Sequence, residues 1–146
     1  MSVEQNKLAE HRLVDEVLNR GEMGVFDELI APEWRERTEQ GMDRDKLREL
    51  VVAWRTGMPD LHCWIDLMVG EGDVVAVRAT LEGTHTGDYL GLAPTGKKVS
   101  SSLNYFDRFE EGLVVESWTE SGAKGFHEQI SGAPYREKTP VPGAAG

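Results

Sequence analysis

The amino-acid sequence predicts a single domain of the α+β class, formed by residues 1–132. Apolar residues recur with helical spacing in the first 57 residues, whereas residues 62–121 contain β-rich segments separated by turn signals. The chain has 146 residues, of which 39% are hydrophobic, which is enough for one core. A curved antiparallel sheet folded over helices leaves a cavity of the kind that binds small apolar ligands.

Three helices are expected before residue 60. The first ends at Asn19–Gly21 and carries an apolar stripe, which consists of Leu8, Leu13, Val14, Val17 and Leu18. The second is expected over Met23–Ile30 and is stopped by Pro32, which has no backbone N–H to donate. Asp43 is the expected N-cap of the third helix, which Gly57–Asp60 close.

About four antiparallel strands are expected after the helices. Their expected ranges are His62–Val69, Val74–Gly87, Val99–Glu110 and Leu113–Ser121. A loop with Gly, Pro and Thr joins the second strand to the third, and tight turns join the other pairs. A short helix containing Phe126 and Ile130 is expected next, and residues 133–146, rich in Pro, Gly and Ala, are expected to form a flexible tail.

The composition of the chain limits which partners, cellular location and metal sites are expected. A formal net charge of −10 repels phosphate backbones, so a nucleic-acid partner is not expected. No run of about 18 apolar residues exists, and the first residues lack the pattern of a signal peptide, so a cytoplasmic protein is expected. Cys63 is the single cysteine, which fits a reducing compartment, and the four histidines have no close ligand spacing that would indicate a metal site.

An acidic pair flanks a tryptophan near the end of the fourth expected strand. Glu116, Trp118 and Glu120 are spaced by two, so a strand places all three on one face. On the inner face, desolvation would raise the pKa of Glu120 towards neutrality and make it a usable base. On the outer face it would be a solvated strand glutamate, and Glu116 lies nearer the turn, at the expected rim of the sheet.

Several short motifs occur in a fixed order along residues 8–130. They are "NRGEMGVFDELIAPEW", "PDL", "GDVVAVR", "GTHTG", "PTGKKV" and "RFEEGLVVESW". In this order and spacing the chain resembles the SnoaL-like polyketide cyclase family of the NTF2-like superfamily. The resemblance implies a cone: a bent antiparallel sheet around a long helix, with a deep apolar pocket and a homodimer formed through the outer face of the sheet.

The resemblance also implies a chemistry. Members of the family close a ring of an aromatic polyketide by an intramolecular aldol reaction, with an aspartate as general acid/base and with no metal and no cofactor. Relatives on the same fold include hydroxylases, epoxide hydrolases, isomerases and dehydratases, so the fold does not fix the reaction.

Two family positions carry different residues here. The aspartate expected four residues after Trp118 is replaced by Gly122, and the pocket histidine after Ala31–Trp34 is replaced by Arg37. The histidine of "GTHTG" is retained as His85. Either Glu120 has taken the role of the aspartate, or other residues run a different reaction, or the protein binds a ligand without catalysis.

The sequence-based hypothesis is a cofactor-independent cyclase or isomerase of secondary metabolism, such as antibiotic biosynthesis, acting on a polyketide-like substrate. Glu120 is the expected acid/base, while Arg37 and His85 position or polarise oxygen. The expected substrate-binding residues are Trp34, Trp54, Trp118, Asn104, Tyr105 and Phe106. The sequence does not decide which face of the strand over residues 98–109 lines the pocket. If Asp107 points inward, it is an alternative to Glu120 as the base. The alternatives are a non-catalytic small-molecule-binding protein, an epoxide hydrolase or a hydroxylase.

Overall fold

A computed structural model describes residues 2–38, 41–122 and 125–133. The helical elements are α1 (Val3–Arg12), a π-helical segment η1 (Leu13–Leu18), α2 (Met23–Leu29), α3 (Arg44–Gly57) and α4 (Phe126–Ser131). The strands are β1 (Ile30–Glu36), β2 (His62–Glu71), β3 (Val74–Thr84), β4 (Lys98–Glu110) and β5 (Leu113–Ser121). Apart from Ala133, the expected tail over 133–146 lies outside the described residues.

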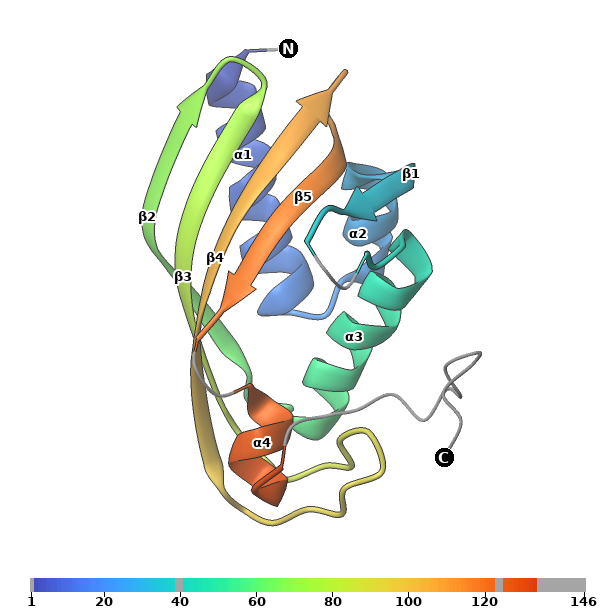
Figure 1. Cartoon of the computed structure of the whole chain (residues 1–146), viewed down its shortest axis with the longest axis vertical. Helices are drawn as coiled ribbons and strands as arrows, with labels where there is room; N and C mark the ends of the chain where they lie inside the picture. The colour runs from blue at the N-terminus through green and yellow to red at the C-terminus, as the bar shows by residue number, and fades with distance from the viewer. Residues whose placement is uncertain (1, 39–40, 123–124, 134–146) are drawn as a thin grey trace, which may run out of the picture.

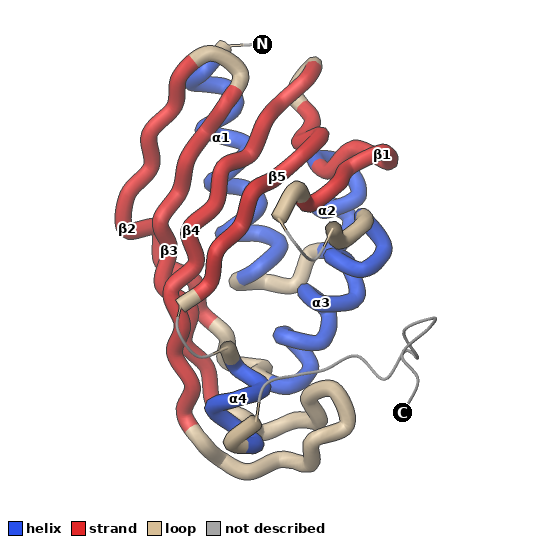
Figure 2. The backbone as a smooth tube through the Cα atoms, viewed as in Figure 1, coloured by secondary structure: helices blue, strands red, loops and turns tan. Residues whose placement is uncertain are grey.

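The five strands form one curved sheet in the order β1-β5-β4-β3-β2 (Figure 1). Neighbouring strands are antiparallel except β1 and β5, which pair in parallel. Helices α1, α2 and α3 cover the concave side of the sheet, and α4 lies beside one end of it (Figure 2). The predicted α+β cone is confirmed, with a mixed sheet that does not close.

The expectation of four antiparallel strands misses β1. The second helix ends at Leu29, and the chain continues as an edge strand that contains Pro32. Proline is tolerated on an edge strand because its missing N–H removes no ladder hydrogen bond there. The register between β1 and β5 shifts between Ile30 and Arg35, the segment that contains Pro32.

The first helix is longer and less regular than its apolar stripe indicates. A capping box between Ser2 and Gln5 begins α1, and the helix continues without a break into η1. Val14 and Val17 are buried against the sheet, as predicted. Two polar side chains of α1, Asn6 and Glu10, are buried on the same side, which the stripe does not predict.

The strand alternation is reproduced most clearly in β3. Val75, Val77, Ala79 and Leu81 are all buried and alternate with more exposed residues. Register shifts between Ile65 and Leu67, and between Arg108 and Phe109, interrupt the ladders at two places. Irregularities of this kind increase local bending and twist, and the curved sheet provides the concave face on which the core packs.

The Asp43 side chain accepts a hydrogen bond from Lys46 N, so the predicted N-cap of α3 is confirmed. In the described part of the chain, no helix has the length and apolarity needed to cross a membrane.

Candidate active site

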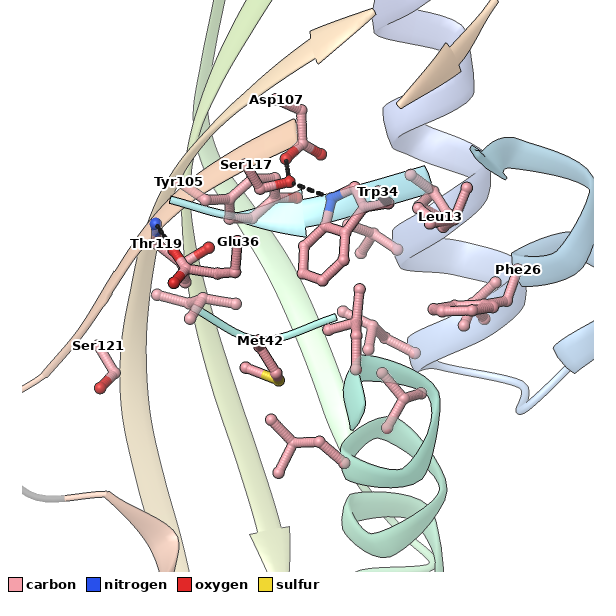
Figure 3. Close-up of a pocket in the computed structure, with 18 of the residues that line it drawn as sticks. Leu13, Phe26, Trp34, Glu36, Met42, Tyr105, Asp107, Ser117, Thr119 and Ser121 are labelled. Atoms are coloured by element: carbon pink, nitrogen blue, oxygen red, sulfur yellow. Dashed lines mark hydrogen bonds between the residues drawn. The ribbon is translucent and has the colours of Figure 1, made fainter. Parts of the chain in front are cut away.

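A cavity of about 770 Å³ lies between the concave face of the sheet and the helices (Figure 3). This volume is in the range of small-molecule sites. Most of its wall is apolar, contributed by Leu13, Val14, Val17, Leu18, Phe26, Ile30, Trp34, Met42, Leu47, Leu50, Val51, Trp54 and Leu103. The other lining residues are polar and include three with buried carboxyl groups, Glu10, Glu36 and Asp107.

The pairing of β4 with β5 decides which residues point into the cavity. Tyr105 faces Thr119, and Asp107 faces Ser117, on the inner side. The neighbouring pairs Asn104–Glu120 and Phe106–Trp118 lie on the outer side because side chains alternate along a strand. The open question about this strand is thereby answered: Tyr105 and Asp107 line the cavity.

A short chain of hydrogen bonds joins β1, β5 and β4 inside the cavity (Figure 3). Trp34 Nε1 donates to Ser117 Oγ over 2.8 Å, and Ser117 Oγ donates to Asp107 Oδ1 over 2.5 Å. An indole N–H can only donate, so the serine oxygen accepts from it and its own hydrogen is directed at Asp107. The arrangement favours the ionised form of Asp107.

Glu10 reaches the same region from α1. Its side chain is fully buried, and Tyr105 Oη donates to Glu10 Oε2 over 3.2 Å. The other carboxyl oxygen, Oε1, has no hydrogen-bond partner among the described residues. A buried oxygen without a donor is costly when the carboxyl group is charged.

Burial raises the pKa of both carboxyl groups. The pKa of Glu10 lies well above its ordinary value of 4.5 because of desolvation, with a further increase from the neighbouring Asp107 carboxyl. Desolvation also raises the pKa of Asp107, while the hydrogen bonds from Glu10 and Ser117 oppose that increase. Two interacting carboxyl groups of this kind titrate as a pair and hold one proton between them over a range of pH.

Glu36, on β1, is a third buried carboxyl group in the cavity. Its Oε1 accepts from Thr119 N over 3.1 Å, and its Oε2 accepts from Thr38 N over 3.0 Å and from the Thr38 hydroxyl. Both oxygens are thus satisfied, one by β5 and the other by Thr38, which follows β1. The geometry fits a carboxylate that fastens this edge of the sheet.

The expectation that Glu120 lies on the inner face is wrong. Its side chain is exposed, although the residue contributes to the cavity edge. Trp118 is 38% exposed on the same outer face and does not line the cavity, so its expected place among the substrate-binding residues is wrong. The physical reason is register: Ser117, Thr119 and Ser121 take the inward positions of β5.

Arg37 lies at the rim, next to the cavity. Its side chain is about half exposed, and its Nε donates to Glu116 Oε2 over 2.9 Å. Glu116 also pairs with Arg108, and these hydrogen bonds lower the pKa of Glu116. Arg37 therefore pairs with the rim glutamate and not with Glu120.

His85 is fully buried, but it lies outside the cavity wall. Its Nδ1 accepts from Thr95 N over 3.2 Å and lies 2.8 Å from Thr95 Oγ1, and its Nε2 lies 3.2 Å from the carbonyl oxygen of Leu92. These contacts fasten the loop between β3 and β4. The expected placement of His85 at the reacting oxygen is wrong because both ring nitrogens are already bound to this loop.

The aromatic residues divide between the two faces. Trp34, Trp54 and Tyr105 line the cavity as expected. Asn104 and Phe106 face outward, and Phe106 is 53% exposed, so their expected placement in the pocket is wrong.

A second cavity of similar volume adjoins the first, between α3, α4 and β4. The two cavities share the residues Met42, Leu50, Trp54, Leu103 and Ser121. Trp54 packs edge-on against Phe126, with ring centroids 6.0 Å apart. This pair therefore stands where the two cavities meet.

Sequence reasoning missed Glu10, Glu36 and Ser117. The one available signal was helical spacing, because Glu10 precedes the apolar positions Leu13, Val14 and Val17 on the same side of the helix. Among the described residues, no group of three or more His, Cys, Asp and Glu is placed to hold a metal ion.

Comparisons with known proteins agree with this architecture. AclR from Streptomyces galilaeus, provisionally described as a hydroxylase, is 26% identical, covers 91% of this chain and all of its own, and has a TM-score of 0.80. A SnoaL-like polyketide cyclase, also provisionally described, from Jannaschia sp. CCS1 is 26% identical over 90% of this chain and 94% of its own, with a TM-score of 0.75.

IdmH from Streptomyces antibioticus, provisionally described as a polyketide cyclase, is 26% identical over 80% of this chain and 91% of its own, with a TM-score of 0.68. No curated protein matches the chain at a comparable level of significance. The family model for SnoaL-like polyketide cyclases matches residues 9–130. The chain therefore belongs to the SnoaL-like polyketide cyclase family.

Proposed function

We propose that the protein is a cytoplasmic, cofactor-independent cyclase or isomerase of natural-product biosynthesis that acts on a polyketide-like substrate by general acid/base proton transfer. The observation that carries the proposal is the Glu10–Asp107 pair, which lies in the wall of an otherwise mostly apolar cavity. Two buried carboxyl groups with one proton between them supply an acid and a base at the same pH. Membership of the family supports the substrate class.

The proton transfers are assigned as follows. The Asp107 carboxylate removes a proton from the carbon next to a substrate carbonyl, and the resulting enolate attacks a second carbonyl of the same molecule. A carbon–carbon bond forms, and the new alkoxide takes the proton held by Glu10. The Asp107 proton then returns to Glu10, which restores the pair. The apolar walls hold the substrate folded, so that the two reacting carbons meet.

The experiment compares Asp107→Asn with Glu120→Gln. The readout is deuterium exchange, followed by NMR, at the acidic carbon of an aromatic ketone with a β-dicarbonyl side chain. Asp107→Asn is expected to lower the exchange rate by about 10²–10⁴-fold, the usual contribution of a general base. If Glu120→Gln lost the exchange and Asp107→Asn kept it, Glu120 would be the general base. Binding of the ketone without exchange by the unmodified protein would favour a non-catalytic carrier.

A hydroxylase is the second candidate, because AclR has a TM-score of 0.80 to this chain. The two candidates differ in the mass of the product and in oxygen consumption. A cyclase or isomerase leaves dissolved oxygen unchanged, whereas a hydroxylase that uses O2 adds one oxygen atom to the product and needs a two-electron donor to reduce the other atom to water. An oxygen electrode combined with mass spectrometry of the product separates them.

A homodimer formed through the outer face of the sheet is also part of the proposal. The observation in its support is a group of exposed apolar side chains on β2, β4 and β5: Trp64, Leu67, Val69, Phe106 and Trp118. Exposed apolar patches of this kind commonly mark an interface. Light scattering should give twice the chain mass for the protein, and Phe106→Glu should give the mass of one chain.

A further inference from the structure

Beyond the proposed base, Asp107, the cavity wall formed by β4 and β5 differs between its two strands. On β5 the next inward residues are Thr119 and Ser121, and both carry a hydroxyl group (Figure 3). On β4 they face Tyr105 and Leu103, which present an aromatic ring and an alkyl side chain. Thr119 and Ser121, the hydroxyl row, therefore make one edge of this wall polar.

The hydroxyl groups of this row are available to a ligand. In the described part of the chain, neither Thr119 Oγ1 nor Ser121 Oγ has a hydrogen bond, and the contact of Thr119 with Glu36 uses its backbone N–H. The Tyr105 hydroxyl, by contrast, is already bound to Glu10. A free hydroxyl group can donate to one ligand oxygen and accept from another.

The charged groups around the hydroxyl row do not suit an ionised ligand. Glu36, which contacts the backbone of Thr119, already accepts hydrogen bonds at both carboxyl oxygens. Arg37 is the one cation that lines the cavity among the described residues, and it is paired with Glu116 at the rim. The other charged residues of the wall are acidic, so a ligand carboxylate would meet like charges. The row therefore fits uncharged oxygens, such as those of ketones and phenols.

We propose that Thr119 and Ser121 are specificity-determining residues, which bind uncharged ketone or phenol oxygens along one edge of a flat aromatic substrate. The position of the reacting carbon at Asp107 is taken from the proposed function. Inward side chains that follow each other on a strand are about 7 Å apart, so the two hydroxyl groups select oxygens at about that separation.

The rest of the cavity opposes oxygens on the other edge of the ligand. Apart from Glu10, the helices contribute only apolar and aromatic side chains to the wall. A hydroxyl group directed at these side chains loses its hydrogen bonds to water and gains none in return. A ligand with its oxygens on one edge should therefore bind more tightly than an isomer with oxygens on both edges.

The experiment compares the affinities of naphthalene-2,7-diol and naphthalene-2,6-diol for the full chain by calorimetry. The first has both hydroxyl groups on one edge, at about the separation of the hydroxyl row, and the second has one on each edge. The one-edge isomer should bind about threefold to tenfold more tightly, which is the order of one hydrogen bond between uncharged groups. In Thr119→Val, and equally in Ser121→Ala, this ratio should fall to about one.

Thr119→Ser keeps the hydroxyl group and should keep the ratio. Thr80→Val makes the same chemical change on β3, where the hydroxyl donates to Asp66 and lies outside the cavity wall, so it should also keep the ratio. Thr119→Ala repeats the test if valine disturbs the fold. A merely structural effect would lower both affinities together, whereas the proposal requires the loss to fall on the one-edge isomer.

Equal affinities for the two diols in the unmodified protein would overturn the proposal, and so would failure to bind either diol. An unchanged ratio in the folded Thr119→Val or Ser121→Ala variant would also overturn it. Because calorimetry needs no turnover, absence of deuterium exchange at the acidic carbon of a ketone would refute the proposed function and leave the role of the hydroxyl row standing.

Discussion

Ser117 and Asp107 face each other across β5 and β4, and the serine hydroxyl lies 2.5 Å from Asp107 Oδ1. The same serine oxygen accepts the indole N–H of Trp34. A single hydroxyl therefore connects an edge strand to the proposed base and sets the direction of the hydrogen bonds between them. This connection makes Ser117 a sensitive point for both stability and proton transfer.

Ser117→Ala should destabilise the protein and raise the pH at which the base becomes ionised. The variant leaves the buried Trp34 N–H without an acceptor, at a cost of about 1–3 kcal/mol in the free energy of unfolding. Loss of the hydroxyl also removes a hydrogen bond that lowers the pKa of Asp107, so this pKa should rise. Urea unfolding and the low-pH limb of the rate profile, which should move to higher pH, measure the two effects.

Ser117→Thr is the matched control, because it keeps the hydroxyl in a residue that strands favour. It should restore most of both properties. An alanine variant whose rate profile matches that of the unmodified protein would show that Ser117 does not act on Asp107.

The strand half of the fold could be predicted from sequence because alternation and turn residues are local signals. In β3 the alternating positions Val75, Val77, Ala79 and Leu81 are all buried, and the turn residues Gly72 and Asp73 precede the strand. In β4 alternation could not choose a face, because both sets of residues mix aromatic and polar side chains: Tyr105 and Asp107 on one, Asn104 and Phe106 on the other. Only the pairing with β5 separates them.

The site was harder to predict because its polar groups meet from distant parts of the chain. Glu10 on α1 belongs to the candidate site because it interacts with Asp107 and Tyr105 on β4, and no local pattern in the helix predicts these contacts. Strand β1 was missed for a related reason. Pro32 stops a helix, but it is also compatible with an edge strand, and only the partner strand β5 distinguishes the two.

Glu10→Gln should change how stability depends on pH. In the folded protein the pKa of Glu10 lies well above 4.5, so between its unfolded and folded pKa values the folded state holds more protons than the unfolded state. The free energy of unfolding of the unmodified protein should therefore fall as pH rises through this window. Glutamine does not titrate, so the stability of the variant relative to the unmodified protein should increase with pH.

Urea unfolding at a series of pH values above about 4.5 measures this difference. Glu4→Gln, at an exposed position of the same helix, is the control and should give a curve parallel to that of the unmodified protein. A parallel curve for Glu10→Gln as well would mean that Glu10 titrates normally in the folded state.

Trp54→Ala should join the two cavities and broaden the range of ligands. Trp54 lines both cavities and contacts Phe126, so its removal opens the wall between them. Affinity for a tetracyclic aromatic ketone should rise relative to that for a bicyclic one, measured by calorimetry. Trp64→Ala is the matched control, because Trp64 is 45% exposed and lines neither cavity. An unchanged affinity ratio in Trp54→Ala would show that the cavities stay separate.

Gly122→Asp should fail to restore the family's acid/base position. A Cβ atom at Gly122 would lie 2.9 Å from Ser102 Oγ and 3.3 Å from Ser102 N. The Ser102 side chain and the backbone of its strand would therefore have to shift. Crowding of this kind costs about 1–3 kcal/mol. Combined with Ser102→Ala, which removes the nearer atom, the substitution should be better tolerated in thermal unfolding. In an Asp107→Asn background, Gly122→Asp should recover no deuterium exchange, whereas recovery would locate the proton transfer at the end of β5 instead of at the Glu10–Asp107 pair.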